Sequence, residues 1–175
     1  VNCAALPEAM FETIMFGHVD GAFPGAGKAK SGKLEASSGG TLLLDEAESM
    51  SPAMQAKLLR VLQDRAVERL GEHGLRALDL RVISTSKTDL RVAGQSGTFR
   101  PDLFYRLAGA ELVTPSLREA GEDIALIFAH YAQLAARRYG RTDPDMGFGL
   151  QQHLKRRPWP GNVREVKAAA EAHAL

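Results

Sequence analysis

The chain has 175 residues, 45% of them hydrophobic and 25% charged, the composition of a soluble globular protein with enough apolar side chains for one main core. Its 22 Lys and Arg nearly balance 21 Asp and Glu, so the net charge gives no reason to expect direct binding to nucleic acid or to a membrane. The single cysteine excludes an internal disulfide and a cysteine zinc site, which favours a cytoplasmic location. The longest apolar run, 124–136, is too short to cross a bilayer.

The first third of the chain predicts a helix, a long loop, a strand and a second helix. Helical spacing of apolar residues predicts the first helix over 7–16. Residues 17–40 are rich in glycine and predict a loop with one short helical turn near 33–36, and ordered loops of this length are often functional. The apolar run 41–44 is typical of a strand covered on both faces in a parallel sheet. Ser51 as N-cap and the following proline begin a helix that ends near residue 64.

The rest of the chain predicts further strands and then only helices. A hairpin is expected within 67–81, and strands are expected at 80–84 and 110–113. Helices are expected at 122–139, at 149–157 and after Gly161. Strands mixed with helices indicate an α/β core over residues 1–115, and the helical end indicates a separate small domain over 116–175.

Two adjacent acids follow the apolar run in the segment GGTLLLDEAE. Asp45 and Glu46 would lie at the carboxyl end of a strand, where α/β sheets bind ligands. In a nucleotide site Asp45 would hold a hydrated Mg²⁺, and Glu46 would orient or deprotonate the attacking water. A solvated acidic turn explains the same residues equally well.

Three arginines are candidates for phosphate contacts. Arg100 and Arg106 in FRPDLFYRL lie six positions apart on a short helix, so one can face the phosphate of a neighbouring subunit while the other braces it. In WPGNVREV, Asn162 as N-cap and Glu165 resemble a capping box, and Arg164 falls in the first helical turn, where an anion could be shared with the helix amides. The alternative for all three is an ordinary exposed arginine.

The order of the motifs is more specific than any one of them. GAFPGA, GGTLLLDE, RVISTS, FRPDLFYRL and WPGNVREV together closely resemble the AAA+ ATPase domain of bacterial enhancer-binding proteins, the activators of sigma-54 RNA polymerase, over the whole of 1–175. The resemblance implies a P-loop NTPase-type parallel sheet followed by a helical lid. It implies ATP and Mg²⁺ as ligands, a ring that is commonly a hexamer, and ATP-driven remodelling of the closed promoter complex. DNA would be bound only by a domain outside this chain.

The same resemblance assigns roles to individual residues. Asp45 and Glu46 match the Walker B motif, and Asn2 matches the asparagine that engages its glutamate. Arg100 and Arg106 match arginine fingers that act on ATP held by the adjacent subunit. The implied nucleotide contacts are Gly39, Gly40, Thr41, Asp45, Glu46, Ser86, Lys87 and the sensor II arginine, Arg164. The implied sigma-54 contacts are the six residues at the tip of the loop 17–32, namely Gly21, Ala22, Phe23, Pro24, Gly25 and Ala26.

The chain departs from the family pattern at several positions. The family loop reads GAFTGA, and Pro24 removes both the threonine hydroxyl and a backbone N–H. Ser86-Lys87 stands in place of the usual Thr-Asn of sensor I, and this lysine resembles members of the dicarboxylate-transport response-regulator type. Val19 stands where an acid is usual. An alternative function is therefore a regulatory or scaffolding module that has lost sigma-54 remodelling; a DNA translocase is disfavoured by the near-neutral charge.

The Walker A loop and the first strand of the family sheet would precede Val1. That strand lies in the middle of the family sheet, and its absence would leave two unpaired edges in the core. We therefore expect the isolated 175 residues to be inactive, to bind ATP weakly and to fold unstably.

Overall fold

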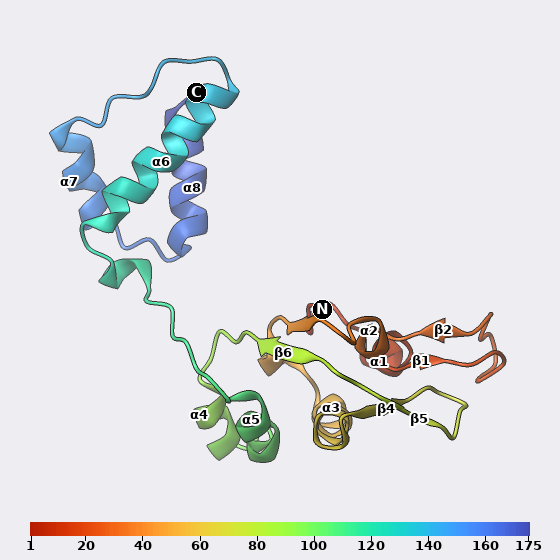
Figure 1. Cartoon of the computed structure of the whole chain (residues 1–175). Coiled ribbons are helices and arrows are strands. Elements are labelled where there is room, and N and C mark those ends of the chain that lie inside the picture. The colour runs from red at the N-terminus through yellow and green to blue at the C-terminus, as the bar shows by residue number, and fades with distance from the viewer. The chain divides into compact units, whose positions relative to one another are not determined.

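The computed structural model describes residues 1–175 and divides into two units, Val1–Glu111 and Leu112–Leu175. Each unit has its own cluster of buried apolar side chains, and Figure 1 shows the course of the chain through the elements of both units. The boundary predicted at 115/116 falls in the exposed segment 112–116, just beyond the division.

The first unit contains all the strands of the chain. Its elements are α1 (Glu8–Met15), β1 (Gly17–His18), β2 (Lys30–Ser31), α2 (Lys33–Ala36), β3 (Thr41–Leu44), the 3-10 turn η1 (Ala47–Ser49), α3 (Pro52–Asp64), β4 (Ala66–Glu68), β5 (Leu75–Ala77), β6 (Arg81–Ser84), α4 (Leu90–Gln95) and α5 (Pro101–Leu107). The predicted helices, the hairpin and the strands near 41–44 and 80–84 are confirmed. Ser51 caps α3 as expected, because its hydroxyl accepts a hydrogen bond from the Met54 amide.

A short parallel sheet organises this unit. β3 and β6 pair in parallel, from Thr41 opposite Arg81 to Leu44 opposite Ser84. The extended segment Val1–Cys3 lies along the other side of β3, because the Cys3 amide donates to the Asp45 carbonyl and the Asp45 amide donates to the Val1 carbonyl, both at 2.8 Å. The parallel α/β arrangement predicted from the sequence is confirmed.

The prediction that β3 is covered on both faces is wrong. Leu42 and Leu44 are buried, whereas Leu43 between them is 45% exposed. Ile83 in β6 is similarly exposed, at 41%. One face of the sheet packs on the core and the other is open in this chain, so the apolar residues on the open face have no covering layer.

The strand predicted at 110–113 is also wrong. These residues form no strand, and Leu112 and Val113 are 93% and 84% exposed. Strand propensity alone does not hold an extended segment in a sheet, because its N–H and C=O groups need a paired neighbour. No strand in the chain pairs with 110–113, although β6 has an unpaired edge.

The two ends of the glycine-rich loop pair as short strands of two residues each, and the loop contacts a second hairpin. β1 and β2 pair antiparallel, Gly17 opposite Ser31 and His18 opposite Lys30. The Val19 amide donates to the Leu70 carbonyl and the Leu70 amide to the Gly17 carbonyl, both at 3.0 Å, which ties the loop base to the β4–β5 hairpin. Gly71, at a φ of +77°, lies so close to Ala22 that an added Cβ would approach the Ala22 Cβ to 2.8 Å. Residues 17–22 of the glycine-rich loop thus lie against residues 70–71, in the connection between β4 and β5.

A partly buried ionic cluster fastens the same hairpin to α2. The Arg69 guanidinium donates two hydrogen bonds of 2.7 Å to the Glu35 carboxylate. Arg76 lies 3.5 Å from Glu35 and forms two further hydrogen bonds with Glu72. The hydrogen bond from Arg69 is the main reason why the pKa of Glu35 is held below its usual value of 4.5.

Replacing Glu35 is expected to loosen the hairpin in a pH-dependent way. The lowered pKa means that the Glu35 charge stabilises the fold fully above pH 4.5 and loses this effect as the pH falls through the folded pKa. Glu35→Gln should therefore cost about 1–3 kcal/mol at neutral pH, because the amide has no charge and only one acceptor oxygen to offer Arg69. The difference from the wild type should shrink below pH 4.5.

The measurement is the opening free energy of hairpin amides 66–77, from hydrogen exchange at several pH values. Glu68→Gln on the same hairpin is the control, since its side chain is 43% exposed and its only ionic neighbour is His73 at 4.0 Å. An equal Glu35→Gln effect at neutral and acid pH would contradict the role of the carboxylate charge.

The second unit is all-helical, with η2 (Leu117–Glu119), α6 (Asp123–Arg138), α7 (Phe148–Arg156) and α8 (Asn162–His173). α6 and α8 lie side by side (Figure 1). Trp159 is buried in the centre of this unit, 2% exposed, and its indole N–H donates to the Leu154 carbonyl at 2.7 Å. None of the helices is both long and apolar enough to cross a membrane.

The prediction that Asn162 is the N-cap of the last helix is wrong. Asn162 has a left-handed backbone, φ +50°, and its side-chain oxygen accepts a hydrogen bond from the Leu117 amide at 2.8 Å. Glu165 accepts from the Gly161 amide at 2.9 Å. The Asn162 side chain is thus used for a tertiary contact, and the carboxylate of Glu165 satisfies the N–H ahead of it.

Candidate functional site

The candidate site lies at the carboxyl edge of the parallel sheet, where β3 and β6 end side by side. Asp45 and Glu46 follow β3, and Thr85 follows β6. The Thr85 hydroxyl donates to the Asp45 carboxylate at 2.6 Å and accepts from the Glu46 amide at 3.1 Å. One hydroxyl therefore positions both acids of the predicted pair.

Glu46 has an unusual backbone conformation. Its φ of 57° and ψ of 52° are left-handed, a region that costs a non-glycine residue about 1–3 kcal/mol. Two hydrogen bonds to Thr85 stabilise this conformation. The Thr85 hydroxyl accepts from the Glu46 amide, and the Thr85 carbonyl accepts from the Ala47 amide at 2.9 Å. The left-handed turn is thus fixed by Thr85 at two consecutive amides.

The Glu46 carboxylate is paired with Lys87, whose ammonium nitrogen lies 2.6 Å from Oε1. Asn2, expected to engage Glu46, lies beside Asp45 in the sheet, but its side-chain oxygen accepts from the Ala5 amide at 3.1 Å. No hydrogen bond joins Asn2 to Glu46. The Lys87 amide donates to Glu48 at 3.1 Å, and the second oxygen of Glu48 is buried without a partner.

Several other residues predicted for the nucleotide site lie elsewhere. Gly39, Gly40 and Thr41 are at the amino end of β3, the end opposite Asp45, so the structure does not bring them together with the acids. Ser86 is adjacent to Thr85, but its hydroxyl forms local hydrogen bonds with Thr88.

The acidic edge fits a hydrated Mg²⁺. One oxygen of Asp45 is occupied by the Thr85 hydroxyl, and the other has no hydrogen bond. The chain contains no group of three or more His, Cys, Asp or Glu side chains that could hold a metal by themselves. A single carboxylate oxygen suits Mg²⁺, which keeps several waters and usually binds together with substrate phosphates.

Arg100 is presented at the start of α5 by a buried glutamine. Gln55 of α3 is 1% exposed, and its side-chain oxygen Oε1 accepts a hydrogen bond from the Arg100 amide at 2.7 Å. The Arg100 guanidinium forms a two-point hydrogen bond with Asp102, at 3.0 and 2.6 Å. This guanidinium holds the pKa of Asp102 below its usual value. The Arg100 side chain is thus exposed, and its guanidinium is held in one orientation by Asp102.

Arg106 makes a different contact. Its guanidinium donates to the Leu62 carbonyl near the end of α3, at 3.1 and 2.7 Å. A cation at the carboxyl end of a helix satisfies a free carbonyl and complements the helix dipole. Arg106 therefore braces α3 within the chain.

Arg164 lies in the first turn of α8 in the second unit, as predicted. Its side chain is exposed and makes no ion pair or hydrogen bond in the chain. The neighbouring Glu165 is instead paired with Arg157 at 2.7 Å.

The tip of the loop, residues 21–26, is largely exposed. Phe23 is 38% exposed, and its ring forms a T-shaped contact with the His18 ring at a centroid distance of 5.4 Å. His18 is 7% exposed, so Phe23 packs against a buried ring. Pro24 follows at the exposed tip.

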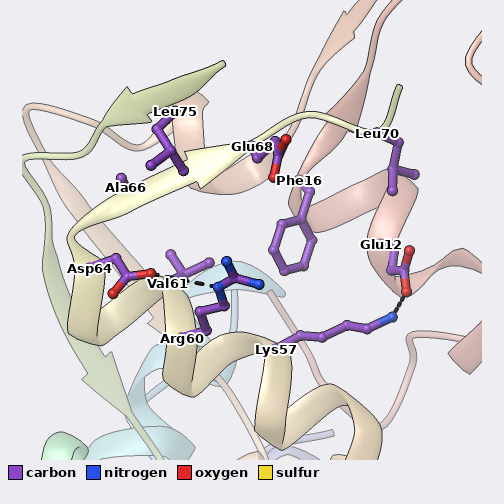
Figure 2. A pocket seen from close by; sticks show the side chains of 10 residues that line it. All are labelled: Glu12, Phe16, Lys57, Arg60, Val61, Asp64, Ala66, Glu68, Leu70 and Leu75. Atoms are coloured by element: carbon purple, nitrogen blue, oxygen red, sulfur yellow. Dashed lines mark ion pairs between the residues drawn. The ribbon is translucent and has the colours of Figure 1, made fainter. Parts of the chain in front are cut away.

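A cavity of about 320 Å³ lies between α1, α3 and the β4–β5 hairpin. Figure 2 shows Phe16 among its lining side chains, the ion pair of Lys57 in α3 with Glu12 in α1, and that of Arg60 with Asp64 within α3. None of the residues predicted for nucleotide binding lines this cavity.

Sequence reasoning missed three residues that build the site, namely Thr85, Gln55 and Glu48. Thr85 immediately follows the strand 81–84, so its place at the carboxyl edge of the sheet was a usable signal. Gln55 follows the apolar Met54 in the helix 52–64 and is buried there. A buried glutamine side chain needs hydrogen-bond partners. Nothing in the sequence alone distinguished Glu48 from an exposed acid.

The chain is similar to known transcription regulators along its whole length. It is 52% identical over 175 residues to the C4-dicarboxylate transport transcriptional regulatory protein DctD of Pseudomonas aeruginosa, covering 100% of the chain and 38% of that protein. It is 46% identical to the probable pathogenicity regulator HrpS of Pseudomonas syringae pv. syringae, covering 100% of the chain and 58% of that protein. The chain thus spans less than two thirds of the length of each of these relatives.

Solved structures agree with this similarity. NtrX from Brucella abortus, crystallised in complex with ATP, superposes with a TM-score of 0.86 at 33% sequence identity, over 98% of the chain and 38% of NtrX. Residues 1–113 match the Sigma-54 interaction domain, and residues 118–175 match the AAA+ ATPase lid domain. With the acids at the sheet edge and the helical second unit, the chain belongs to the sigma-54 interaction domain family of AAA+ proteins.

Proposed function

We propose that the chain is the central part of a longer cytoplasmic regulator that hydrolyses ATP to remodel the closed complex of sigma-54 RNA polymerase and activate transcription. The observation that carries the proposal is the pair of acids Asp45 and Glu46, both held by Thr85 at the carboxyl edge of the parallel sheet. The relation to regulators such as DctD supports it. DNA would be bound by another part of the regulator.

In this proposal the two acids have different chemical roles. Asp45 would bind Mg²⁺ through water with its free oxygen, and the ion would supply charge neutralisation to the phosphates. Glu46 would orient the attacking water or accept its proton. The left-handed turn at Glu46 supports this role, because strained backbone of this kind clusters at functional sites.

Arginines would complete the site. The family resemblance assigns Arg100 and Arg106 to ATP held by an adjacent subunit of a ring, commonly a hexamer, and Arg164 to nucleotide binding as the sensor II arginine. The exposed, oriented guanidinium of Arg100 supports its role as a finger. Arg106, which braces α3, suits a supporting role at the same interface.

The loop 17–32 would contact sigma-54 through residues 21–26. Its base is hydrogen-bonded to the β4–β5 hairpin, and its aromatic Phe23 rests on His18 near the tip. A partly exposed aromatic side chain of this kind is a common anchor of protein interfaces.

Phe23→Ala in the full-length regulator is expected to reduce transcription from a sigma-54 promoter about thirtyfold or more, the effect of losing an interface anchor of 2 kcal/mol. ATP hydrolysis should stay within about twofold of wild type, because Phe23 is separate from the acidic edge. The measurements are in vitro transcription and phosphate release. Phe148→Ala is the control, since Phe148 is 77% exposed on the second unit.

Pro24→Thr distinguishes the proposal from an ATPase module that has lost remodelling. If the wild-type regulator activates transcription as well as Pro24→Thr does, the proline tip is competent. Activation by Pro24→Thr alone would favour the regulatory or scaffolding alternative.

A further inference from the structure

The first turn of α8, which carries Arg164, is held by the carboxylate of Glu165. One oxygen of Glu165 accepts from the Gly161 amide at 2.9 Å, and the other accepts from the Arg157 guanidinium at 2.7 Å. The hydrogen bond from Gly161 is the main cause, and that from Arg157 the second, of a Glu165 pKa below its usual value of 4.5. Both oxygens of this carboxylate are therefore occupied, one at the start of α8 and one by a cation that follows α7.

Arg157 is held from a second direction by Trp159. The guanidinium carbon of Arg157 lies 4.5 Å from the centroid of the Trp159 ring, within the range of a cation–π contact, and tryptophan is the best aromatic partner of a cation. The ring is fixed, because Trp159 is 2% exposed and its indole N–H donates to the Leu154 carbonyl at 2.7 Å. The Arg157 side chain is 45% exposed, yet it has two partners where an ordinary surface ion pair has one.

The backbone between these contacts is a tight turn. Trp159 and Asn162 both have left-handed conformations, with φ of +45° and +50°. A Cβ added at Gly161 would approach the Glu165 Cβ to 2.8 Å, so the turn lies directly against this residue. Strained turns of this kind persist only where the surrounding contacts determine them. The conformation in which α8 begins therefore depends on the contacts of Arg157 and Glu165.

Arg164 has no such support of its own. Its side chain is exposed and makes no ion pair or hydrogen bond in the chain, so its place is set by the backbone of the first turn. We propose that Arg157 is a positioning residue for Arg164: by holding Glu165 and stacking on Trp159, it keeps the first turn of α8 in the conformation from which Arg164 binds the phosphates of ATP. This inference rests on the proposed function, in which Arg164 contributes to nucleotide binding.

The test is a double-mutant cycle on Arg157 and Arg164 in the full-length regulator. Equilibrium binding of adenylyl-imidodiphosphate, an ATP analogue that resists hydrolysis, is measured for the wild type, Arg157→Gln, Arg164→Gln and the double variant. Arg157→Gln should weaken binding about three- to tenfold, the combined effect of a cation–π contact and an ion pair. In the Arg164→Gln background the same change should alter binding less than about twofold, because the arginine that Arg157 positions is already absent.

Two further variants separate positioning from charge. Arg156→Gln is the matched control, because Arg156 is the neighbouring basic residue, is exposed and makes no ion pair or hydrogen bond in the chain. It removes the same charge, so a general loss of attraction for phosphate would weaken binding equally in Arg156→Gln and Arg157→Gln and would contradict the proposal. Arg157→Lys keeps a cation for Glu165 and Trp159, and it should restore binding to within about twofold of the wild type.

Hydrogen exchange of backbone amides separates positioning from unfolding. In Arg157→Gln the amides of 161, 162 and 165, which are hydrogen-bonded in the turn, should lose protection, while those in the middle of α6 and α8 keep it. Loss of protection throughout α6 and α8 would make Arg157 a residue of the fold alone and would overturn the proposal.

The binding data have equally definite outcomes. Equal weakening by Arg157→Gln in both backgrounds, or no effect of either single variant, would overturn the positioning role and leave the ATPase proposal intact. A wild-type regulator that neither binds the analogue nor hydrolyses ATP would overturn the proposed function, and the positioning role would fail with it.

Discussion

Glu46→Gln in the full-length regulator is expected to lower kcat for ATP hydrolysis by about 10²- to 10⁴-fold, the usual contribution of a general base. Glutamine keeps the size of the side chain, and the backbone is held by Thr85 in either case. It cannot accept a proton, so the chemical step should fail while nucleotide still binds. The effect should therefore lie in kcat, with affinity for ATP at least as high as in the wild type.

The measurements are steady-state phosphate release and equilibrium ATP binding on the same preparation. Glu68→Gln is the matched control, because Glu68 is an exposed carboxylate on β4 of the same unit. Activity of Glu46→Gln within about twofold of wild type would exclude Glu46 as the base, and loss of ATP binding would indicate a structural role instead.

Arg100→Ala is expected to reduce kcat by about 10³- to 10⁵-fold, the effect of removing an arginine finger from phosphoryl transfer. The substitution should leave the fold intact, because Gln55 binds the backbone amide of Arg100 and its guanidinium meets only the exposed Asp102. Arg106→Ala should in addition destabilise the unit, since it removes the two hydrogen bonds to the end of α3.

Mixing two inactive variants tests whether Arg100 acts on a neighbouring subunit. An Arg100→Ala subunit supplies an intact Glu46, and a Glu46→Gln subunit supplies an intact Arg100. In a ring, mixed assemblies should recover part of the ATPase activity that neither variant shows alone. Failure to recover activity, in mixtures shown to co-assemble, would contradict action across the subunit interface.

The sequence by itself determined the family, the order of the elements and the position of the acids. The motif order from the loop tip to Arg164 was specific enough for the family because five separate segments had to agree. The acids at 45 and 46 were predictable because carboxyl ends of parallel strands share one edge.

Only the tertiary structure decided the partners of the side chains. Glu46 pairs with Lys87 and not with Asn2. The reason is that β3 and β6 end side by side, while the Asn2 side chain accepts a hydrogen bond from the Ala5 amide. The exposure of Leu43 likewise depends on layers that no local pattern reports. Propensity and motif spacing act over a few residues, whereas an ion pair or a covered sheet face depends on segments some forty positions away, such as 46 and 87.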